Sequence, residues 1–276
     1  MIIWLSSYPK SGNTFVRSLL ASHFYTNDGS FDFNLLEKIK QFPDNILFEN
    51  LGINTKDKNE LEKNFINVQK IINKRDGETL RFLKTHSVLN NEHGYVLTDI
   101  YNTLGVIYIV RDPRSVIKSY ANHMQISESE AFETLKSYRY ISGSRGETLM
   151  GDWSSNYKSW KIFKKKNKYL LIRYEDLLND TRSTFFKILE FVYKLSNSKL
   201  EIKEDKFLKC INSTKFENLQ NLELQSGFQE AAHQNGKKVT FFKYGKLNDG
   251  KNSLSPNLTK KVEKFYNKEM IELGYL

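Results

Sequence analysis

IIWLSSYPKSGNTFVRSLLASHF, residues 2–24, begins with four apolar residues typical of a β-strand and continues with apolar residues at helical spacing. Pro9 and Gly12 interrupt the pattern between the two halves. The stretch therefore predicts a strand, a tight loop and a helix. A loop that enters a helix N-terminus presents unpaired backbone N–H groups and the positive end of the helix dipole, which together bind phosphate or sulfate.

The residues of this loop can bind an anion through their side chains as well. Lys10 adds a positive charge, Gly12 permits close approach of the backbone, and the hydroxyls of Ser11 and Thr14 can donate hydrogen bonds. The loop is not the P-loop motif GxxxxGK[ST], because its lysine precedes its glycine. The alternative interpretation is an ordinary strand-to-helix turn with a solvated Lys10.

The composition is that of a globular protein, with 39% hydrophobic and 27% charged residues. The net charge of +10 indicates either an anionic partner or a lysine-rich surface. No apolar run reaches eighteen residues and the apolar start, residues 1–5, lacks the features of a signal peptide, so neither a membrane partner nor an export signal is expected. The single cysteine, Cys210, excludes an internal disulfide and is typical of a cytoplasmic protein.

Residues 80–84, 105–110 and 169–172 predict three further strands, of which 105–110 is a continuous apolar run. Continuous apolar runs separated by helical patterns are typical of a parallel sheet buried on both faces. With no repeat and no linker, we predict an α/β fold over residues 1–276, a single domain with a central parallel β-sheet flanked by helices. Helices are expected near 33–40, 59–73, 113–124, 182–193, 206–211 and 257–273, two helical stretches within 128–166, and a loop over 224–241.

The order YPKSGNTF, residues 8–15, resembles the YPKSGTTW loop of the cytosolic-type sulfotransferases. Those enzymes transfer a sulfuryl group from 3′-phosphoadenosine-5′-phosphosulfate (PAPS) to a hydroxyl or amine. The resemblance implies a P-loop-NTPase-like sulfotransferase fold. Asn13 and Phe15 depart from the Thr and Trp that the family has at these positions. The loop residues that would contact the nucleotide are Lys10, Ser11, Gly12, Asn13, Thr14 and Phe15.

Lys84-Thr85-His86, after the second predicted strand, resembles the KTH segment of the same family. The carboxyl ends of parallel strands line the ligand crevice of an open sheet, so Lys84 and His86 are expected beside the anion loop. By residue type alone, His86 would more often be structural. In the family the histidine takes the proton from the acceptor and the lysine contacts the sulfuryl group. The resemblance thus implies Lys10, Lys84 and His86 as catalytic residues.

Arg111 and Ser119 have the spacing of the family's 3′-phosphate site, an arginine at a strand end and a serine eight residues later. A guanidinium fork binds a phosphate better than an ammonium does. FKYGKLNDGKN, residues 242–252, looks like a degraded copy of the family's RKGxxGDWKN segment, in which lysine now replaces arginine. This resemblance implies three more contacts to the 3′-phosphate, from Lys243, Tyr244 and Gly245.

Three residues are implied in binding the adenosine half of the nucleotide. Tyr174 lies in a match to the family's YED turn, although an ordinary half-buried strand tyrosine explains it nearly as well. Thr214 and Phe216 have the spacing of the family's adenine contacts. Asn156, in a helix similar to the family's GSW helix, stands where the family commonly has a histidine.

These segments together predict a PAPS-dependent sulfotransferase that releases 3′,5′-adenosine bisphosphate (PAP) and uses no metal, because the five histidines lack metal-ligand spacing. The acceptor, a small molecule or a sugar with a hydroxyl or an amine, is left open. Its pocket is expected from residues 26–78, 125–150 and 224–241. The absence of the KTVxxxE dimer pattern leaves a monomer or weak homodimer as the expected state.

Other functions remain open. A P-loop-type small-molecule kinase would share the first strand, loop and helix but would need ATP and magnesium. A basic nucleic-acid-binding protein would explain the charge, but the aromatic residues interleaved with arginine that stack on bases are missing, so no nucleic-acid partner is expected. The RDPR segment, residues 111–114, also resembles membrane-anchored glycan sulfotransferases, and the presence of His86 favours the soluble branch.

Overall fold

The computed structural model describes residues 1–74, 80–90, 93–143, 145–234, 237–243 and 250–276. The chain forms two compact units. The first comprises Met1–Tyr8, Ile39–Val110 and Tyr138–Glu201, and the second comprises Pro9–Lys38, Arg111–Ser137 and Ile202–Leu276. The single domain that the sequence predicts over residues 1–276 stays a prediction.

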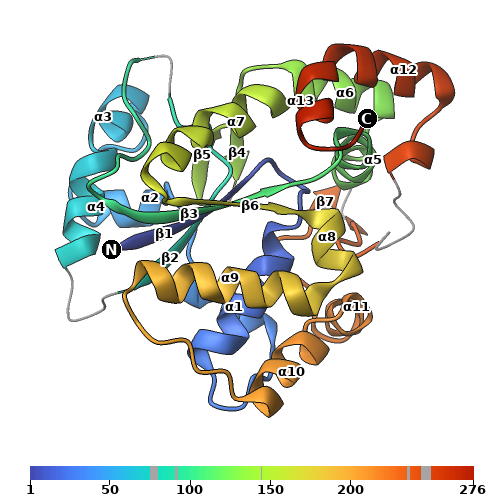
Figure 1. The fold of residues 1–276 in the computed structure, drawn as a ribbon. Coiled ribbons are helices and arrows are strands. Elements are labelled where there is room, and N and C mark those ends of the chain that lie inside the picture. The colour runs from blue at the N-terminus through green and yellow to red at the C-terminus, as the bar shows by residue number, and fades with distance from the viewer. Residues whose placement is uncertain (75–79, 91–92, 144, 235–236, 244–249) are drawn as a thin grey trace. The chain divides into compact units, whose positions relative to one another are not determined.

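The first unit is built on a four-stranded parallel sheet in the order β2-β1-β3-β6 (Figure 1). The side chains of β1 are buried on both faces, as expected for a parallel strand between two neighbours. The α/β class with a central parallel sheet is thus confirmed, and each predicted strand is found. Their bounds are β1 Ile2–Ser7, β2 Arg81–Thr85, β3 Thr103–Val110 and β6 Tyr169–Arg173.

Helices α7 (Trp153–Trp160) and α9 (Thr181–Leu195) lie on opposite faces of this sheet (Figure 1). On the face towards α9, β3 has Gly105, where a Cβ atom would lie 2.2 Å from Cδ1 of Leu195. On the face towards α7, β3 has Tyr108, whose ring is 5.7 Å from the ring of Tyr157. A glycine therefore lets one helix approach closely, and an aromatic pair fills the other interface.

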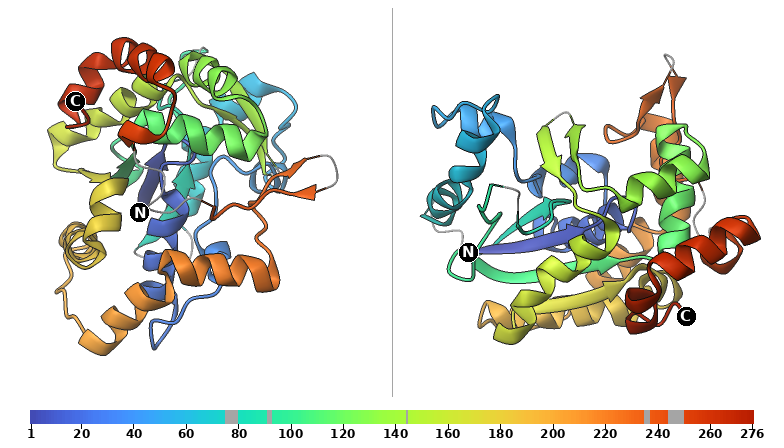
Figure 2. Two further views of the ribbon diagram at one scale, coloured as in Figure 1. Left: turned by 90° about the vertical axis from the view of Figure 1, so that its right-hand side faces the viewer. Right: turned by 90° about the horizontal axis from the view of Figure 1, so that it is seen from above.

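The first unit has two helices that the sequence does not predict, α2 (Asn45–Glu49) and α8 (Tyr174–Asn179), and it departs from the predicted pattern in two further places. The predicted helix over 59–73 is broken at Asn64, which ends α3 and whose side chain donates to the carbonyl of Glu60. The predicted link between two helices contains the hairpin β4–β5, seen as two short antiparallel arrows in Figure 2, right. The remaining bounds are α2 Asn45–Glu49, α3 Lys58–Lys63, α4 Phe65–Lys74, β4 Tyr140–Gly143, β5 Gly146–Leu149, η2 Lys161–Lys166 and α8 Tyr174–Asn179.

The second unit is mainly helical and has an aromatic core. Arg17 of α1 pairs with Glu230 at 2.7 Å and donates to the carbonyl of Leu36 at 3.1 Å, which ties α1 to two distant segments of the unit. The core comprises Phe31, Leu36, Leu219, Phe228, Ala231 and Phe242. The bounds are α1 Asn13–Tyr25, η1 Phe33–Lys38, α5 Pro113–Met124, α6 Glu128–Lys136, α10 Glu204–Ser213, α11 Phe216–Ser226, β7 His233–Gln234, β8 Lys237–Lys238, η4 Gly250–Asn252, α12 Pro256–Phe265 and α13 Asn267–Glu272.

The helix ends of the second unit follow the sequence signals closely. Asp112 caps α5 by accepting from the backbone N–H of Arg114 at 2.9 Å, and Ser255 caps α12. The predicted C-terminal helix is two helices, with Tyr266 between α12 and α13. The loop predicted over 224–241 is shorter than expected, because α11 continues to Ser226. Two antiparallel strands of two residues each, β7 and β8, follow.

No described helix is long and apolar enough to cross a membrane. Among the described residues, no three or more His, Cys, Asp or Glu side chains are grouped to hold a metal ion.

Candidate functional site

The loop between β1 and α1 has an unusual backbone. Lys10 and Gly12 have φ angles of 65° and 99°, both in the left-handed region. That region is unfavourable for a lysine, and such strained residues concentrate at functional sites. Gly12 is the N-cap of α1, and no described side chain caps the helix there. The loop therefore presents the helix N-terminus in the form that binds an anion.

Side chains of the loop are largely buried. Ser11 is fully buried, and its hydroxyl has no hydrogen-bond partner among the described residues. A buried hydroxyl without a partner is costly, and a bound anion would satisfy it. Asn13 and Thr14 are also buried, while Phe15 is half-buried and packs against the aromatic core of the second unit.

Lys10 is held by two residues of the second unit. Its ammonium lies 3.6 Å from the centre of the Phe241 ring, a cation–π contact. Its carbonyl accepts a hydrogen bond from Nη1 of Arg111 at 3.1 Å. His123 packs edge-on against Phe241, and burial together with the charge of Lys10 lowers the pKa of His123 from 6.5 to about 4. His123 is therefore neutral at pH 7. The contact between Lys10 and Phe241 is one that the sequence did not predict.

Two predicted 3′-phosphate residues lie on or beside α5. Ser119 is half-buried in the middle of this helix. Nζ of Lys243 donates to Oδ1 of Asn122 at 2.7 Å, and residues three apart share one face of a helix. The structure thus brings Lys243 to the helix that carries Ser119. The predicted contacts Tyr244 and Gly245 lie outside the described residues.

Arg114, in the first turn of α5, has a different environment from Arg111, which precedes the helix. Arg114 is buried and pairs with Asp112 at 2.6 Å and with Glu263 at 2.5 Å. It also donates to the carbonyl of Tyr275 at 3.0 Å. These bonds connect the start of α5 to the C-terminal segment. The guanidinium of Arg114 is therefore engaged in bonds to other groups of the protein.

The two predicted adenine contacts lie two residues apart in the chain but differ in exposure. Thr214 is fully buried at the end of α10, and its hydroxyl donates to the carbonyl of Cys210 at 2.8 Å. Phe216 begins α11, is half-buried, and packs edge-on against Phe242 at 6.2 Å. A ring contact through Phe216 is therefore more accessible than a hydrogen bond from Thr214.

His86 belongs to the first unit and follows the end of β2 at Thr85. Its Nδ1 lies 2.9 Å from the carbonyl oxygen of Ser7, at the end of β1, and 3.3 Å from the hydroxyl of the same residue. A carbonyl only accepts hydrogen bonds, so the Nδ1 atom carries the proton that this bond requires. In the neutral ring, Nε2 then has the lone pair, as a general base needs.

The backbone of His86 is fixed by a residue seventy positions later. Nδ2 of Asn156 donates to the carbonyls of His86 and Met150, both at 2.8 Å. Oδ1 of Asn156 accepts from the hydroxyl of Tyr108 at 2.9 Å. Burial raises the pKa of Tyr108, so its hydroxyl stays protonated and keeps this bond. Asn156 is fully buried with each of its amide groups in use.

The two other predicted residues of the first unit are buried. Lys84 lies in β2, paired in register with Leu5 of β1. Tyr174 begins α8, directly after β6. The structure describes Lys84, His86 and Tyr174 in the first unit and the other described site candidates in the second.

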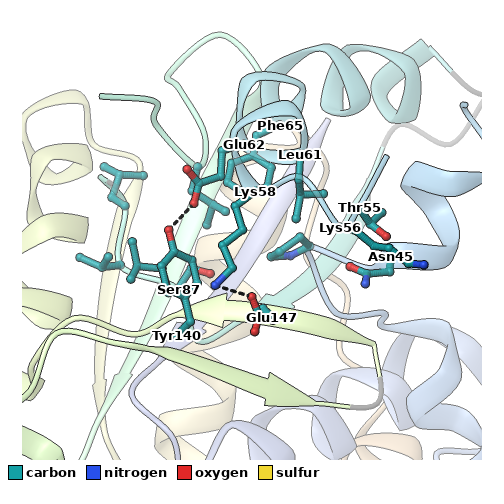
Figure 3. Close-up of a pocket in the computed structure, with 15 residues that line it drawn as sticks. Asn45, Thr55, Lys56, Lys58, Leu61, Glu62, Phe65, Ser87, Tyr140 and Glu147 are labelled. Atoms are coloured by element: carbon teal, nitrogen blue, oxygen red, sulfur yellow. Dashed lines mark hydrogen bonds and ion pairs between the residues drawn. The ribbon is translucent and has the colours of Figure 1, made fainter. Parts of the chain in front are cut away.

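A cavity of about 360 Å³ lies entirely within the first unit (Figure 3). Ser87, Val88 and Leu89, the three residues after His86, form part of its wall. The rest comes from segments 43–65 and 140–149 and from Leu97. The two segments lie in regions where the sequence predicts the acceptor pocket, and that role stays a prediction. Its volume is within the range of sites for small molecules.

A sequence model of the sulfotransferase domain matches residues 2–274. The chain belongs to this family. The family inferred from the YPKSGNTF loop is thereby confirmed. A 3-beta-hydroxysteroid sulfotransferase from Cavia porcellus is 28% identical over 175 residues, which cover 60% of this chain and 55% of that protein. A flavonol 4′-sulfotransferase from Flaveria chlorifolia is 24% identical over 99% of this chain and 80% of its own length. The aligned part thus spans about half the length of the steroid sulfotransferase.

The fold is also that of solved sulfotransferases. A mouse sulfotransferase in complex with PAP superposes with a TM-score of 0.57 at 19% identity, over 98% of this chain and 84% of that one. Similarity at this identity shows a shared fold, and it agrees with the sulfotransferase fold that the sequence predicts.

Proposed function

We propose that this protein transfers a sulfuryl group from PAPS to a hydroxyl or amine of a small-molecule or sugar acceptor and releases PAP. The observation that carries the proposal is the hydrogen bond from Nδ1 of His86 to the Ser7 carbonyl, because it prepares Nε2 to accept a proton. Family membership, relatives named as steroid and flavonol sulfotransferases, and a mouse sulfotransferase with PAP give further support.

The second unit carries the residues that would bind the nucleotide. The loop residues, with the left-handed Lys10 and Gly12, would bind the 5′-phosphate through backbone N–H groups and the helix dipole. Arg111, Ser119 and Lys243 would bind the 3′-phosphate. The adenosine would pack against Phe216 beside Thr214, with Tyr174 of the first unit as a further contact.

The first unit carries the residues that would act on the acceptor. Nε2 of His86 would take the acceptor's proton as the acceptor oxygen or nitrogen attacks sulfur, while the bond from sulfur to the 5′-phosphate oxygen breaks. Lys84 would stabilise the sulfuryl oxygens, and Lys10 the charge that grows on the leaving phosphate. General-base catalysis of this kind contributes about 10²- to 10⁴-fold.

Chain connectivity supports a shared role for Lys10 and His86. Ser7, which binds His86, is three residues before Lys10 in the sequence. Three residues of extended chain span at most about 11 Å between Cα atoms. Lys10 therefore lies in the same short segment as Ser7, the residue that accepts the hydrogen bond of His86.

Transfer of labelled sulfate from PAPS to a panel of phenols, alcohols, amines and sugars, with EDTA present, tests this function. We expect label transfer without added metal and measurable binding of PAP by calorimetry. Tight binding of ATP with no affinity for PAP, or transfer of phosphate from ATP that requires magnesium, would instead support the small-molecule kinase.

A further inference from the structure

The cavity of the first unit combines an apolar wall with one deeply buried carboxylate. The side chain of Glu62 is only 3% exposed, although it lines the cavity. Burying a carboxylate is costly unless donors or a positive charge surround it. The apolar part of the wall comprises Pro43, Leu61, Phe65, Val88, Leu89, Leu97 and Leu149.

Among the described residues, two side chains donate to Glu62. The Tyr140 hydroxyl donates to Oε1 at 2.8 Å, and Nδ1 of His93 lies 2.6 Å from Oε2 (Figure 3 shows the tyrosine bond). A carboxylate has about four acceptor positions, so these two bonds leave part of its capacity open. His93 is 42% exposed, and its imidazole is a weaker partner for a buried charge than a lysine or arginine would be.

Lys58, one of the two lysines in the cavity wall, is paired with another carboxylate. Nζ of Lys58 lies 2.8 Å from Oε2 of Glu147 and 4.0 Å above the ring of Tyr140. Figure 3 shows Lys58 directed to Glu147 and away from Glu62. In the described chain, no lysine or arginine forms an ion pair with Glu62. Among the described residues, this buried carboxylate therefore has no permanently cationic partner.

We propose that the acceptor carries a cationic nitrogen and that Glu62 binds this group inside the cavity. The inference rests on the proposed sulfuryl transfer, for which the cavity would hold the acceptor. An ammonium would donate to the open positions of the carboxylate, and a charge-assisted hydrogen bond is strong where water is excluded. The apolar body of the acceptor packs on the leucine and valine wall, and its reacting hydroxyl lies towards Ser87, the residue after His86. The acceptor class is an amphipathic amine with a hydroxyl.

Three phenols of similar size test the charge preference on the native protein. Tyramine, tyrosol and 4-hydroxyphenylacetate share one phenol and differ in carrying an ammonium, a hydroxyl or a carboxylate. We expect calorimetry on the full chain with PAP to give tyramine a dissociation constant about tenfold or more below that of tyrosol. The carboxylate should bind most weakly. Equal binding of tyramine and tyrosol, tighter binding of the carboxylate, or no binding of tyramine overturns the proposal.

A pair of variants on one helix assigns the preference to Glu62. Glu62→Gln should remove the advantage of tyramine over tyrosol. Glu60→Gln, which removes the same charge from α3 outside the cavity wall, should leave the advantage unchanged. If folded Glu62→Gln still binds tyramine more tightly than tyrosol, another group is responsible for this preference, and the role of Glu62 is refuted. The comparison of ligands on the native protein decides the charge preference even where this variant does not fold.

The two proposals fail in different ways. Sulfuryl transfer to tyrosol and tyramine with equal efficiency would contradict the charge preference and leave the transferase function standing. Binding of tyramine that depends on Glu62, with no transfer from PAPS, would support the cavity assignment and contradict the transferase function.

Discussion

Replacing His86 by alanine separates the proposed chemistry from nucleotide binding. The substitution removes the imidazole and its bond to the Ser7 carbonyl, which costs about 0.5–1.5 kcal/mol of folding stability. The bond from Asn156 is made to the backbone carbonyl of residue 86 and survives the change. The nucleotide candidates other than Tyr174 belong to the second unit, whereas His86 belongs to the first. The fold and the affinity for PAP should therefore change little.

The loss of rate should be much larger. Without Nε2 the acceptor proton must leave to water, and losing a general base costs about 10²- to 10⁴-fold in kcat. This factor corresponds to about 2.7–5.5 kcal/mol in the activation free energy, well above the expected loss of stability. The acid limb of the pH–rate profile, which reports protonation of an essential base, should also disappear in His86→Ala.

Three measurements on one preparation test this expectation. Turnover with labelled PAPS at saturating acceptor gives kcat, calorimetry gives the dissociation constant of PAP, and thermal unfolding reports the fold. We expect the PAP constant to stay within about threefold, a change below 1 kcal/mol. A loss of PAP affinity as large as the loss of rate would show that His86 is structural, and a rate within a few-fold of the native protein would remove it from the mechanism.

Three other substitutions test separate parts of the structure. Lys10→Met should lower both kcat and PAP affinity, because the lysine is proposed to contact the phosphate in the bound state and in the transition state; an unchanged kcat would exclude it. Gly29→Ala should lower the melting temperature by several degrees more than Gly52→Ala: both glycines have positive φ, but a Cβ at residue 29 would lie 2.4 Å from the Lys206 carbonyl, whereas residue 52 has open space. The pKa of His123 is about 4 in the folded chain against 6.5 ordinarily, so the unfolded chain binds more protons between these values and stability falls as the pH drops through this window. His123→Gln should remove about 2 kcal/mol of that pH dependence, measured by urea unfolding at pH 6.5 and 4.5.

The sheet could be predicted because its strands carry their own signal. Val106 to Val110 is a continuous apolar run, and such a run is typical of a parallel strand with both faces covered. The start of α5 was equally clear, since Asp112 and Pro113 are a cap and a first-turn residue whose roles depend on local backbone geometry alone. Local signals of this kind fix elements without knowledge of the tertiary structure.

Features that depend on distant residues could not be predicted. Hairpin β4–β5 has the weak alternation of two half-exposed strands, and its register comes from pairs such as Tyr140 with Leu149. The cavity has walls from four separate segments, so its buried carboxylate has no sequence signature. The cation–π contact between Lys10 and Phe241 joins residues more than two hundred positions apart. Such contacts follow from packing, which one sequence does not specify.

The segment that looked degraded in the sequence has a physical explanation at one of its positions. Gly250 stands where the RKGxxGDWKN pattern has tryptophan, and a Cβ atom there would lie 2.1 Å from Oδ2 of Asp112. Asp112 caps α5 and pairs with Arg114, so any side chain at residue 250 would displace the start of the helix that carries Ser119. Glycine in place of tryptophan therefore allows the backbone at residue 250 to lie close to Asp112, the cap of α5. In this chain the geometry of the proposed 3′-phosphate site depends on the glycine, and restoring the family residue would disturb Ser119.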